Sequence, residues 1–197
     1  LWQLGVTPAP LNPKLTPAEL AAAKAALSGV RSKAQAIVWT SGTAGHPRGV
    51  EVSFAGLSAN AEASAARLLL TDDDVWAASL SFAHVGGLAL LVRALLLGSD
   101  LVVLGAFDAR RLDEALEGRG LPLGYNRPVT HVSLVPIQLK KLLDQRGDEP
   151  APETARCVLT GGAHAPTALV GRAGRLGWPI ALTYGMTEMT SQGATAA

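Results

Sequence analysis

The stretch Thr40-Ser41-Gly42-Thr43-Ala44-Gly45-His46-Pro47-Arg48-Gly49 decides how the rest of the chain is interpreted. It follows directly on the apolar run Ala36-Ile37-Val38-Trp39, which predicts a buried strand. Glycines let backbone N–H groups turn toward an anion, hydroxyl groups add donors, and the guanidinium of Arg48 can bind two phosphate oxygens at once. The stretch therefore predicts a phosphate-binding loop, and a polar turn between two strands is the alternative.

The order of residues in this loop excludes two common nucleotide-binding patterns. G-x-x-x-x-G-K-[ST] fails because the fifth residue after Gly42 is Pro47, and G-x-G-x-x-G is absent. The stretch instead resembles the T-S-G-[ST]-[ST]-G-x-P-K-G signature of the adenylate-forming superfamily, which includes acyl-CoA synthetases, luciferases and the adenylation domains of peptide synthetases. Ala44 replaces a hydroxyl residue and Arg48 replaces lysine, so one phosphate donor is missing and the cation has a different shape. The resemblance implies catalysis for Arg48, magnesium binding for Thr43, and ATP binding for Thr40, Ser41, Gly42, Thr43, Ala44 and Gly45.

The composition of the chain excludes several classes of protein. Its 197 residues are 48% hydrophobic and 17% charged with a formal net charge of +1, which fits an enzyme and gives no electrostatic reason to expect nucleic acid. Cys157 is the single cysteine, so no internal disulfide forms, and we expect a cytoplasmic protein. The longest apolar run, Val85 to Leu97, contains Arg93 and is shorter than the roughly 18 residues of a membrane span, so none is expected.

The N-terminal part of the chain carries a helix start and a second resemblance. Thr16, Pro17 and Glu19 form a capping box with proline at the first helical position. Leu11 to Leu20 resembles the N-P-R-L-T-x-x-E-L stretch upstream of the phosphate loop in adenylate-forming enzymes, where many more residues usually separate the two. We expect missing strand-helix units here and, because the chain starts at Leu1, a processed protein or a piece of a longer one. The expected division is 1–35 as an N-terminal segment and helix and 36–197 as the AMP-binding domain, without the C-terminal lid domain.

Strands and helices are predicted to alternate from Ala36 to Thr183. Apolar runs predict strands, and apolar residues at helical spacing predict helices. Nearly every predicted strand is apolar throughout, which is typical of a parallel sheet covered on both faces. We therefore predict an α/β fold, corresponding to a truncated form of the large N-terminal domain of the superfamily. The predicted strands include 50–52, 75–80, 100–104, 129–136 and 179–183, and the predicted helices include 54–70, 89–97, 137–145 and 169–176.

The run Phe82-Ala83-His84-Val85-Gly86-Gly87-Leu88 lies at a predicted junction of strand and helix. A histidine beside apolar residues is usually structural, but parallel sheets bind ligands at such junctions. The run also resembles the F-H-x-x-G-L element that lines the acyl pocket of acyl-CoA synthetases, with Ala83 between the aromatic residue and the histidine. The resemblance implies substrate contacts for His84, Val85, Gly86 and Gly87.

Two other polar groups are interpreted as structural. Asp72-Asp73-Asp74 lacks the spaced pattern of a metal site and predicts a solvated turn. His131 lies in a predicted strand, and no nucleophile accompanies it. The run from Thr130 to Leu143 around it is similar to a run in the o-succinylbenzoate-CoA ligases of menaquinone synthesis, which is the most family-specific resemblance in the chain.

Two motifs near the end of the chain complete the resemblance. The first motif is Gly161-Gly162-Ala163. In the superfamily a G-G-A turn lies against adenine, because residues without bulk let the backbone pass close to a flat base. A plain turn between strand and helix is the alternative. The run from Tyr184 to Glu188 matches Y-G-x-T-E, which implies that Tyr184 stacks on adenine, Thr187 holds the phosphates and Glu188 binds magnesium. Ser191-Gln192 matches the T-x-S-Q ending of the o-succinylbenzoate ligases. The implied nucleotide contacts are Gly161, Gly162, Ala163, Thr183, Tyr184, Gly185 and Met186, with Thr187 and Glu188 catalytic and Ser191 in contact with substrate.

The resemblance implies an ATP-dependent acid-thiol ligase that uses Mg2+ and coenzyme A. A carboxylic acid becomes an acyl-adenylate, and coenzyme A then displaces AMP. We expect o-succinylbenzoate as the acid. The alternatives are an aryl- or fatty-acyl-CoA ligase and a non-catalytic binding remnant, while a hydrolase using Ser41 is disfavoured because the G-x-S-x-G elbow is absent. The superfamily places its catalytic lysine after the Y-G-x-T-E motif, and no lysine follows Lys141, so we expect poor activity of the chain alone. The sequence does not decide whether the chain forms a homodimer.

Overall fold

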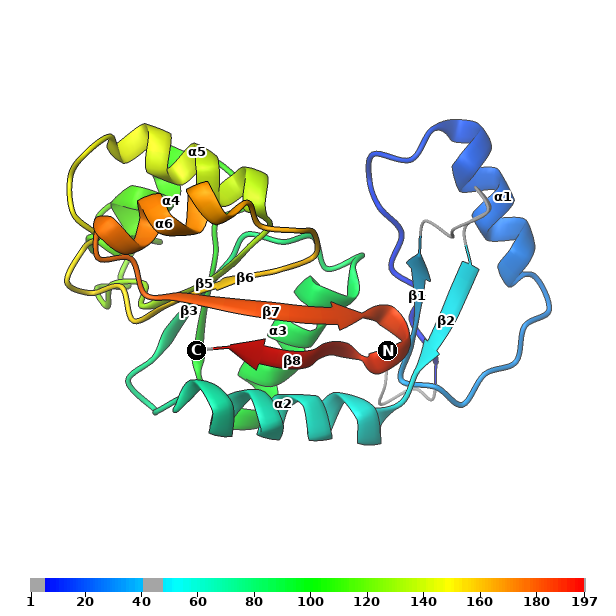
Figure 1. Ribbon diagram of the computed structural model, residues 1–197. Coiled ribbons are helices and arrows are strands. Elements are labelled where there is room, and N and C mark those ends of the chain that lie inside the picture. The colour runs from blue at the N-terminus through cyan, green and yellow to red at the C-terminus, as the bar shows by residue number, and fades with distance from the viewer. Residues whose placement is uncertain (1–5, 41–47, 197) are drawn as a thin grey trace.

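The computed structural model describes residues 6–40 and 48–196, which form two separate sheets and the helices around them (Figure 1). In the larger sheet the strand order is β4-β3-β5-β6-β7-β8. All neighbouring pairs in it are parallel except β7 and β8, which are antiparallel. This mixed, mostly parallel sheet confirms the predicted α/β class. Its strands are β3 (Val75–Ala78), β4 (Asp100–Val103), β5 (His131–Leu134), β6 (Cys157–Thr160), β7 (Ile180–Met186) and β8 (Ser191–Ala196).

The first predicted strand forms but does not join the parallel sheet. β1 (Ala36–Thr40) pairs with β2 (Arg48–Val52) as an antiparallel hairpin, with Ala36 opposite Val52 and Thr40 opposite Arg48. The prediction that this strand belongs to the parallel sheet was wrong, because two parallel neighbours need a crossover of about a dozen residues or more, and the connection between β1 and β2 is shorter. Residues 41–47, which connect the two strands, lie outside the described residues.

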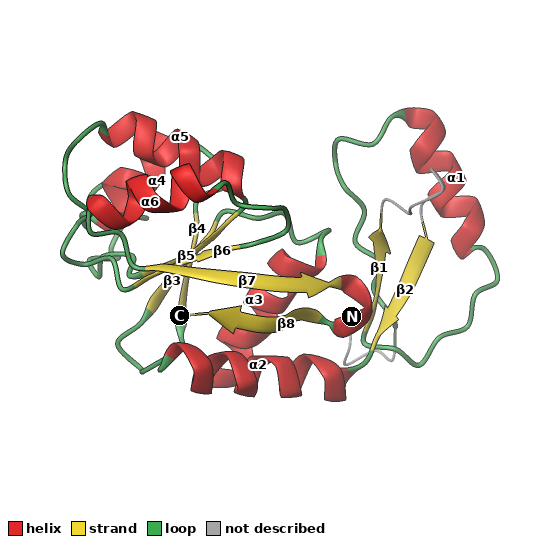
Figure 2. Ribbon diagram, viewed as in Figure 1, coloured by secondary structure: helices red, strands yellow, loops and turns green. Residues whose placement is uncertain are grey.

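Helices cover both faces of the large sheet (Figure 2). Side chains alternate along β3, so that Val75 and Ala77 join the core on one face while Trp76 and Ala78 join the core on the other. Leu112, Leu139 and Ala173, from three different helices, pack on the first face. On the second face, Leu90 packs against Trp76. The helices of the first face are α4 (Ala109–Leu116), α5 (Pro136–Arg146) and α6 (Thr167–Arg175), and those of the second are α2 (Phe54–Leu68) and α3 (Val85–Leu97).

The hairpin is attached to the second helical layer. Val38 and Val52 form an apolar cluster with Leu57 of α2 and with Leu88 and Val92 of α3. Upstream of the hairpin, α1 (Pro17–Leu27) begins with the predicted capping box between Thr16 and Glu19. The hairpin and the helical layer therefore share an apolar core.

Two element boundaries near the candidate site differ from the prediction. β7 continues through Met186 instead of ending at Thr183, and β8 follows it after the 3-10 turn η2 (Thr187–Met189). The sequence of β8, Ser-Gln-Gly-Ala-Thr-Ala, lacks the bulky β-branched and aromatic residues that mark a strand. α3 begins at Val85, four residues before the predicted start. The first turn was not predicted because Gly86 and Gly87 have a low helix propensity.

Within the described ranges 6–40 and 48–196, the helices are too short or too polar to cross a membrane.

Candidate functional site

A cavity of about 130 Å³ lies at the C-terminal ends of the parallel strands. Leu80 after β3, Leu134 in β5, Leu159 in β6 and Thr183 in β7 contribute to its wall, and the N-terminal half of α3 closes one side. After β3 the chain adds β4 on one side of it and then β5 on the other, so the strand order reverses between β3 and β5. Such a reversal leaves a crevice at the strand ends, where sheets of this kind bind ligands.

The cavity brings together motifs that are far apart in the sequence. The strand-to-helix junction, the G-G-A turn, the Y-G-M-T-E run and the end of the chain all contribute. The predicted substrate residues among its lining are Val85, Gly86 and Ser191, and the predicted nucleotide residues are Gly161, Gly162, Thr183 and Gly185. Their placement fits the predicted functions, which stay predictions for the individual contacts.

A second, more open hollow lies beside the first. It has a volume of about 640 Å³ and is lined by Ala163, His164, Thr183 and Tyr184, among others. Tyr184 is 63% exposed, which leaves surface on which a flat base can stack. Thr183 lines both hollows, so the predicted acyl and adenine regions are neighbours.

Two of the predicted glycines are already required by packing. A Cβ atom at Gly161 would lie 2.5 Å from Cγ2 of Thr183 on the neighbouring strand, so no larger residue fits there. A Cβ atom at Gly87 would lie 2.3 Å from the carbonyl oxygen of Ser81, and Gly87 is buried away from the cavity lining. The close approach of neighbouring backbone therefore explains both glycines without a ligand.

Other predicted site residues do not line the two cavities. Thr187 is half-buried and Glu188 exposed in η2, directly after Met186, and η2 contacts β2 of the hairpin. Thr40 ends β1 and Arg48 begins β2, so they flank the predicted phosphate loop. His84 is the exposed N-cap residue of α3. Ser41, Gly42, Thr43, Ala44 and Gly45 lie outside the described residues.

Glu188 is the carboxylate that the sequence predicts to bind magnesium. Within the described part of the chain, no three His, Cys, Asp or Glu side chains gather in a way that could hold a metal ion. Glu188 is therefore a single exposed carboxylate in η2, two residues after the end of β7. A single carboxylate suits Mg2+ when substrate phosphates and water supply the remaining oxygen ligands.

The sequence interpretation missed Arg93, the cation of the first cavity. Arg93 is only 2% exposed, and its guanidinium carbon lies 5.1 Å from the centre of the Trp76 ring. Nη2 donates to Oγ of Ser64 (3.1 Å) and to Oε1 of Gln192, while Nε and Nη1 have no hydrogen-bond partner among the described residues. Burial lowers the pKa of Arg93 to about 10, so the group remains a cation at neutral pH. An arginine inside an otherwise apolar helix was the available signal, and it was used only to exclude a membrane span.

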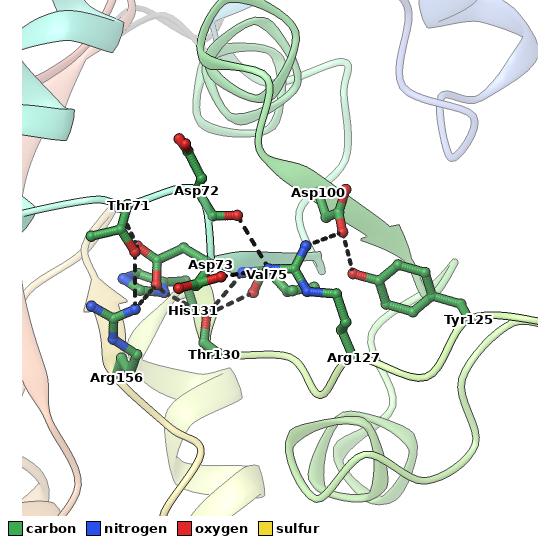
Figure 3. Close-up of polar contacts among 11 residues, drawn as sticks. Thr71, Asp72, Asp73, Val75, Asp100, Tyr125, Arg127, Thr130, His131 and Arg156 are labelled. Carbon is green, nitrogen blue, oxygen red and sulfur yellow. Dashed lines mark hydrogen bonds and ion pairs between the residues drawn. The ribbon is translucent and has the colours of Figure 1, made fainter.

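A second buried polar cluster lies at the opposite, N-terminal end of the sheet (Figure 3). The prediction of a solvated turn fits Asp72 and Asp73 but was wrong for Asp74, which is completely buried. Asp74 accepts a hydrogen bond from the backbone N–H of Thr71 (2.7 Å), forms an ion pair with Arg156, and lies 3.5 Å from Nδ1 of His131. This cluster joins the turn before β3 to the starts of β5 and β6.

His131 in this cluster is held in its neutral form. Burial, opposed by Asp74 and assisted by the positive charges of Arg156 and Arg93, lowers its pKa to about 4. Nδ1 lies 2.8 Å from the hydroxyl of Thr130, and the ring packs against Trp76 at 4.9 Å between centres. These contacts agree with the structural interpretation of His131.

A family model and curated relatives both match this chain. Residues 30–197 match the model of the family described as AMP-binding enzyme. A 2-succinylbenzoate–CoA ligase of Bacillus cereus is 39% identical over 160 residues, which are 81% of this chain and 32% of that protein. The chain therefore spans about a third of the length of the curated relatives it matches.

Solved structures agree with this comparison. The o-succinylbenzoate coenzyme A synthetase of Bacillus subtilis, in complex with AMP, matches with a TM-score of 0.75 and 31% identity over 83% of this chain and 32% of that chain. MenE of Escherichia coli matches with a TM-score of 0.80 over 99% of this chain and 47% of that chain. At 24% identity, the second match shows the fold alone.

Proposed function

The chain belongs to the AMP-binding enzyme family, and from this membership we propose that it serves in the ATP-dependent activation of o-succinylbenzoate and its transfer to coenzyme A. In the first step a carboxylate oxygen of the acid attacks the α-phosphorus of ATP, and the bond to pyrophosphate breaks. In the second step the thiolate sulfur of coenzyme A attacks the acyl carbonyl carbon, and AMP leaves. The relatives named for this reaction, with 39% and 31% identity, support this proposal.

The observation that carries the choice of acid is Arg93. A buried cation is costly unless an anion pairs with it, and no acidic side chain in residues 6–40 or 48–196 pairs with Arg93. Two of its nitrogens are buried without a hydrogen-bond partner among the described residues, and Arg93 lines a cavity whose other walls are largely apolar. An arginine with free N–H groups matches a carboxylate in geometry and charge.

This arrangement fits o-succinylbenzoate better than a simple fatty acid. o-Succinylbenzoate has an aromatic ring and two carboxylates, of which only one is activated. The second carboxylate keeps its charge in the adenylate and needs a cationic partner, while the ring needs an apolar wall such as Leu80, Leu134 and Leu159 provide. A fatty acid has no second carboxylate and would leave Arg93 unpaired.

The nucleotide is proposed to occupy the neighbouring hollow. Adenine would stack on Tyr184 beside Ala163, and the phosphates would extend toward Thr187 and the loop after Thr40. The hydroxyl of Thr43 and the carboxylate of Glu188 are hard oxygen donors that suit Mg2+, which neutralises phosphate charge when it is bound. Arg48 at the start of β2 would offset the charge that develops on the phosphates.

The first test is calorimetric titration of the full 197-residue chain with o-succinylbenzoate, with ATP plus magnesium, and with a sulfonamide analogue of o-succinylbenzoyl-adenylate. The variant Arg93→Met fills the same space without charge. We expect it to bind the acid and the analogue on the order of 10- to 100-fold more weakly, because a charged hydrogen bond is lost, and to be at least as stable as the parent chain.

The matched control is Arg110→Met, because Arg110 is exposed on α4 and paired only with Glu114 in the described residues. We expect this variant to bind like the parent chain. Binding of a fatty acid but not of o-succinylbenzoate would favour the alternative ligase. Nucleotide binding without any acid binding would favour the non-catalytic remnant, and equal affinities of the Arg93→Met and parent chains would remove Arg93 from the proposal.

A further inference from the structure

We propose that Gln192 is a positioning residue, which fixes the Arg93 guanidinium without neutralising it and so keeps the cation available to the carboxylate of an acidic ligand. This inference rests on the proposed function, because it concerns the same cavity. Gln192 lies in β8, the strand that the sequence did not reveal. It faces Arg93 of α3 across the wall of the cavity.

The first step of the argument is that Gln192 and Ser64 occupy only one nitrogen of Arg93. Oε1 of Gln192 accepts from Nη2 of Arg93 and from Oγ of Ser64 (2.8 Å), and Nη2 also donates to Oγ of Ser64 (3.1 Å). The three side chains thus form a closed set of hydrogen bonds from α3, β8 and α2. Because the set uses Nη2 alone, it fixes the plane of the guanidinium and leaves Nη1 and Nε without partners among the described residues.

The second step concerns the orientation of the Gln192 amide. Its Nε2 donates to Oγ1 of Thr195 (3.2 Å), which in turn lies 3.1 Å from Oγ1 of Thr183. Since the nitrogen end has its own acceptor, the oxygen end is directed to Arg93. The amide therefore presents a dipole to the cation. Thr183, which lines both hollows, continues this series of contacts by donating its hydroxyl to the carbonyl oxygen of Ala194 (3.0 Å).

The backbone of Gln192 is held as firmly as its side chain. The Nδ2 group of Asn60 in α2 donates to the Gln192 carbonyl oxygen at 2.8 Å. Directly before it, Thr190 and Ser191 have φ angles of 59° and 98°, which side chains of L-residues rarely adopt. Such strained backbone persists only where its surroundings impose it, and it is concentrated at functional sites.

The third step is the difference between an amide and a carboxylate. Glutamate has nearly the same shape as glutamine and would accept the same bonds from Arg93 and Ser64. A buried glutamate would also form an ion pair with Arg93 and cancel the charge that an acidic ligand needs. A neutral acceptor at this position holds the cation and preserves its charge.

The test compares Gln192→Glu with Gln192→Leu in the full chain, titrated with o-succinylbenzoate, alongside urea unfolding of each variant. We expect Gln192→Glu to weaken binding on the order of 10- to 100-fold, and Gln192→Leu, which removes the acceptor but adds no charge, only about 3- to 10-fold. A purely structural role predicts the opposite order, because glutamate is closer in shape to glutamine than leucine is. The matched control is Gln145→Glu on the exposed side of α5, which should bind like the parent chain.

The outcomes separate this inference from the proposed function. If the parent chain binds the acid and Gln192→Glu binds it as well as, or better than, Gln192→Leu, the inference is overturned while the proposed function stands. If the parent chain does not bind the acid, both are overturned. Should Gln192→Glu fail to fold, Gln192→Leu decides alone, since unchanged affinity in a folded Gln192→Leu chain would overturn the positioning role.

Discussion

Each end of the large sheet buries a charged side chain, and the two side chains differ in their partners. One charge has an oppositely charged partner, and the other has only neutral ones among the described residues. At the N-terminal end, Asp74 is 0% exposed and is surrounded by Arg156, His131 and the backbone N–H of Thr71. At the C-terminal end, Arg93 is 2% exposed, two of its nitrogens lack partners among the described residues, and its partners there are neutral. The Trp76 and His131 rings lie between the two charges.

The difference supports our assignment of a structural role to the N-terminal end and of ligand binding to the C-terminal end. A buried charge with a complete set of partners holds elements together, and at Asp74 these are the turn before β3 and the starts of β5 and β6. Figure 3 shows Thr71, His131 and Arg156 from these elements. A buried charge without a counterion lowers the stability of the free protein, so its presence requires another reason. The reason that we propose is an anionic ligand in the adjacent cavity.

Removal of Asp74 is the strongest test of the structural end. Asp74→Ala leaves the Arg156 guanidinium, which is 45% exposed, and the Thr71 N–H without their acceptor. We expect the free energy of unfolding to fall by about 3 kcal/mol, because more than one hydrogen bond to a charged group is lost. Urea unfolding followed by circular dichroism measures the change. Asp73→Ala is the matched control, because the Asp73 side chain is 95% exposed, and its loss should change stability by less than about 0.5 kcal/mol. Equal effects of the two variants would contradict the assignment.

Lowering the pH should reduce the free energy of unfolding, because His131 at the same end of the sheet is buried in its neutral form. Its pKa in the folded chain is about 4, below the ordinary value of 6.5, chiefly because of burial. Between these values the unfolded chain binds a proton that the folded chain does not, so the stabilising effect is complete above pH 6.5 and is lost as the pH falls toward 4. We expect a loss on the order of 2 kcal/mol in urea unfolding over this range. His131→Gln should lack this part of the pH dependence, and a slope equal to that of the parent chain would exclude His131 as its cause.

Sequence reasoning predicted the α/β class because the parallel strands are apolar on both faces and the helices carry clear start signals. Ser53 and Asp108, residue types that favour helix starts, cap α2 and α4. The hairpin was mistaken for part of the parallel sheet because an isolated strand gives no information about its partner, and β8 was missed because its residues are small and polar. Strand pairing depends on distant residues, which local patterns do not contain.

The same limit applies to the site. Motif matches indicated Val85, Gly161, Thr183 and Ser191, which do lie around one cavity. Arg93 was not recognised as part of it, because burial and the absence of a counterion are properties of the folded chain. Asp74 was misjudged for the converse reason, since nothing in three consecutive aspartates shows which one turns inward.

Two substitutions that each remove one hydroxyl group have the smallest expected effects, and they test the difference between the two ends of the sheet most directly. Ser64→Ala removes one of the groups that hold Arg93, and Thr130→Val removes the hydroxyl that contacts His131 and accepts from the backbone N–H of Val75 at 2.9 Å. Each change should cost about 1 kcal/mol, but in different measurements. Ser64→Ala should weaken binding of o-succinylbenzoate about 3- to 10-fold with a smaller loss of stability than Thr130→Val, because Gln192 still holds the guanidinium. Thr130→Val should lower the free energy of unfolding by about 1 kcal/mol with unchanged binding, because it leaves the buried N–H of Val75 unpaired and Thr130 does not line the cavity. If both variants lost binding and stability in the same proportion, the two ends of the sheet would form one structural unit, and the distinction between a paired charge for folding and an unpaired charge for binding would fail.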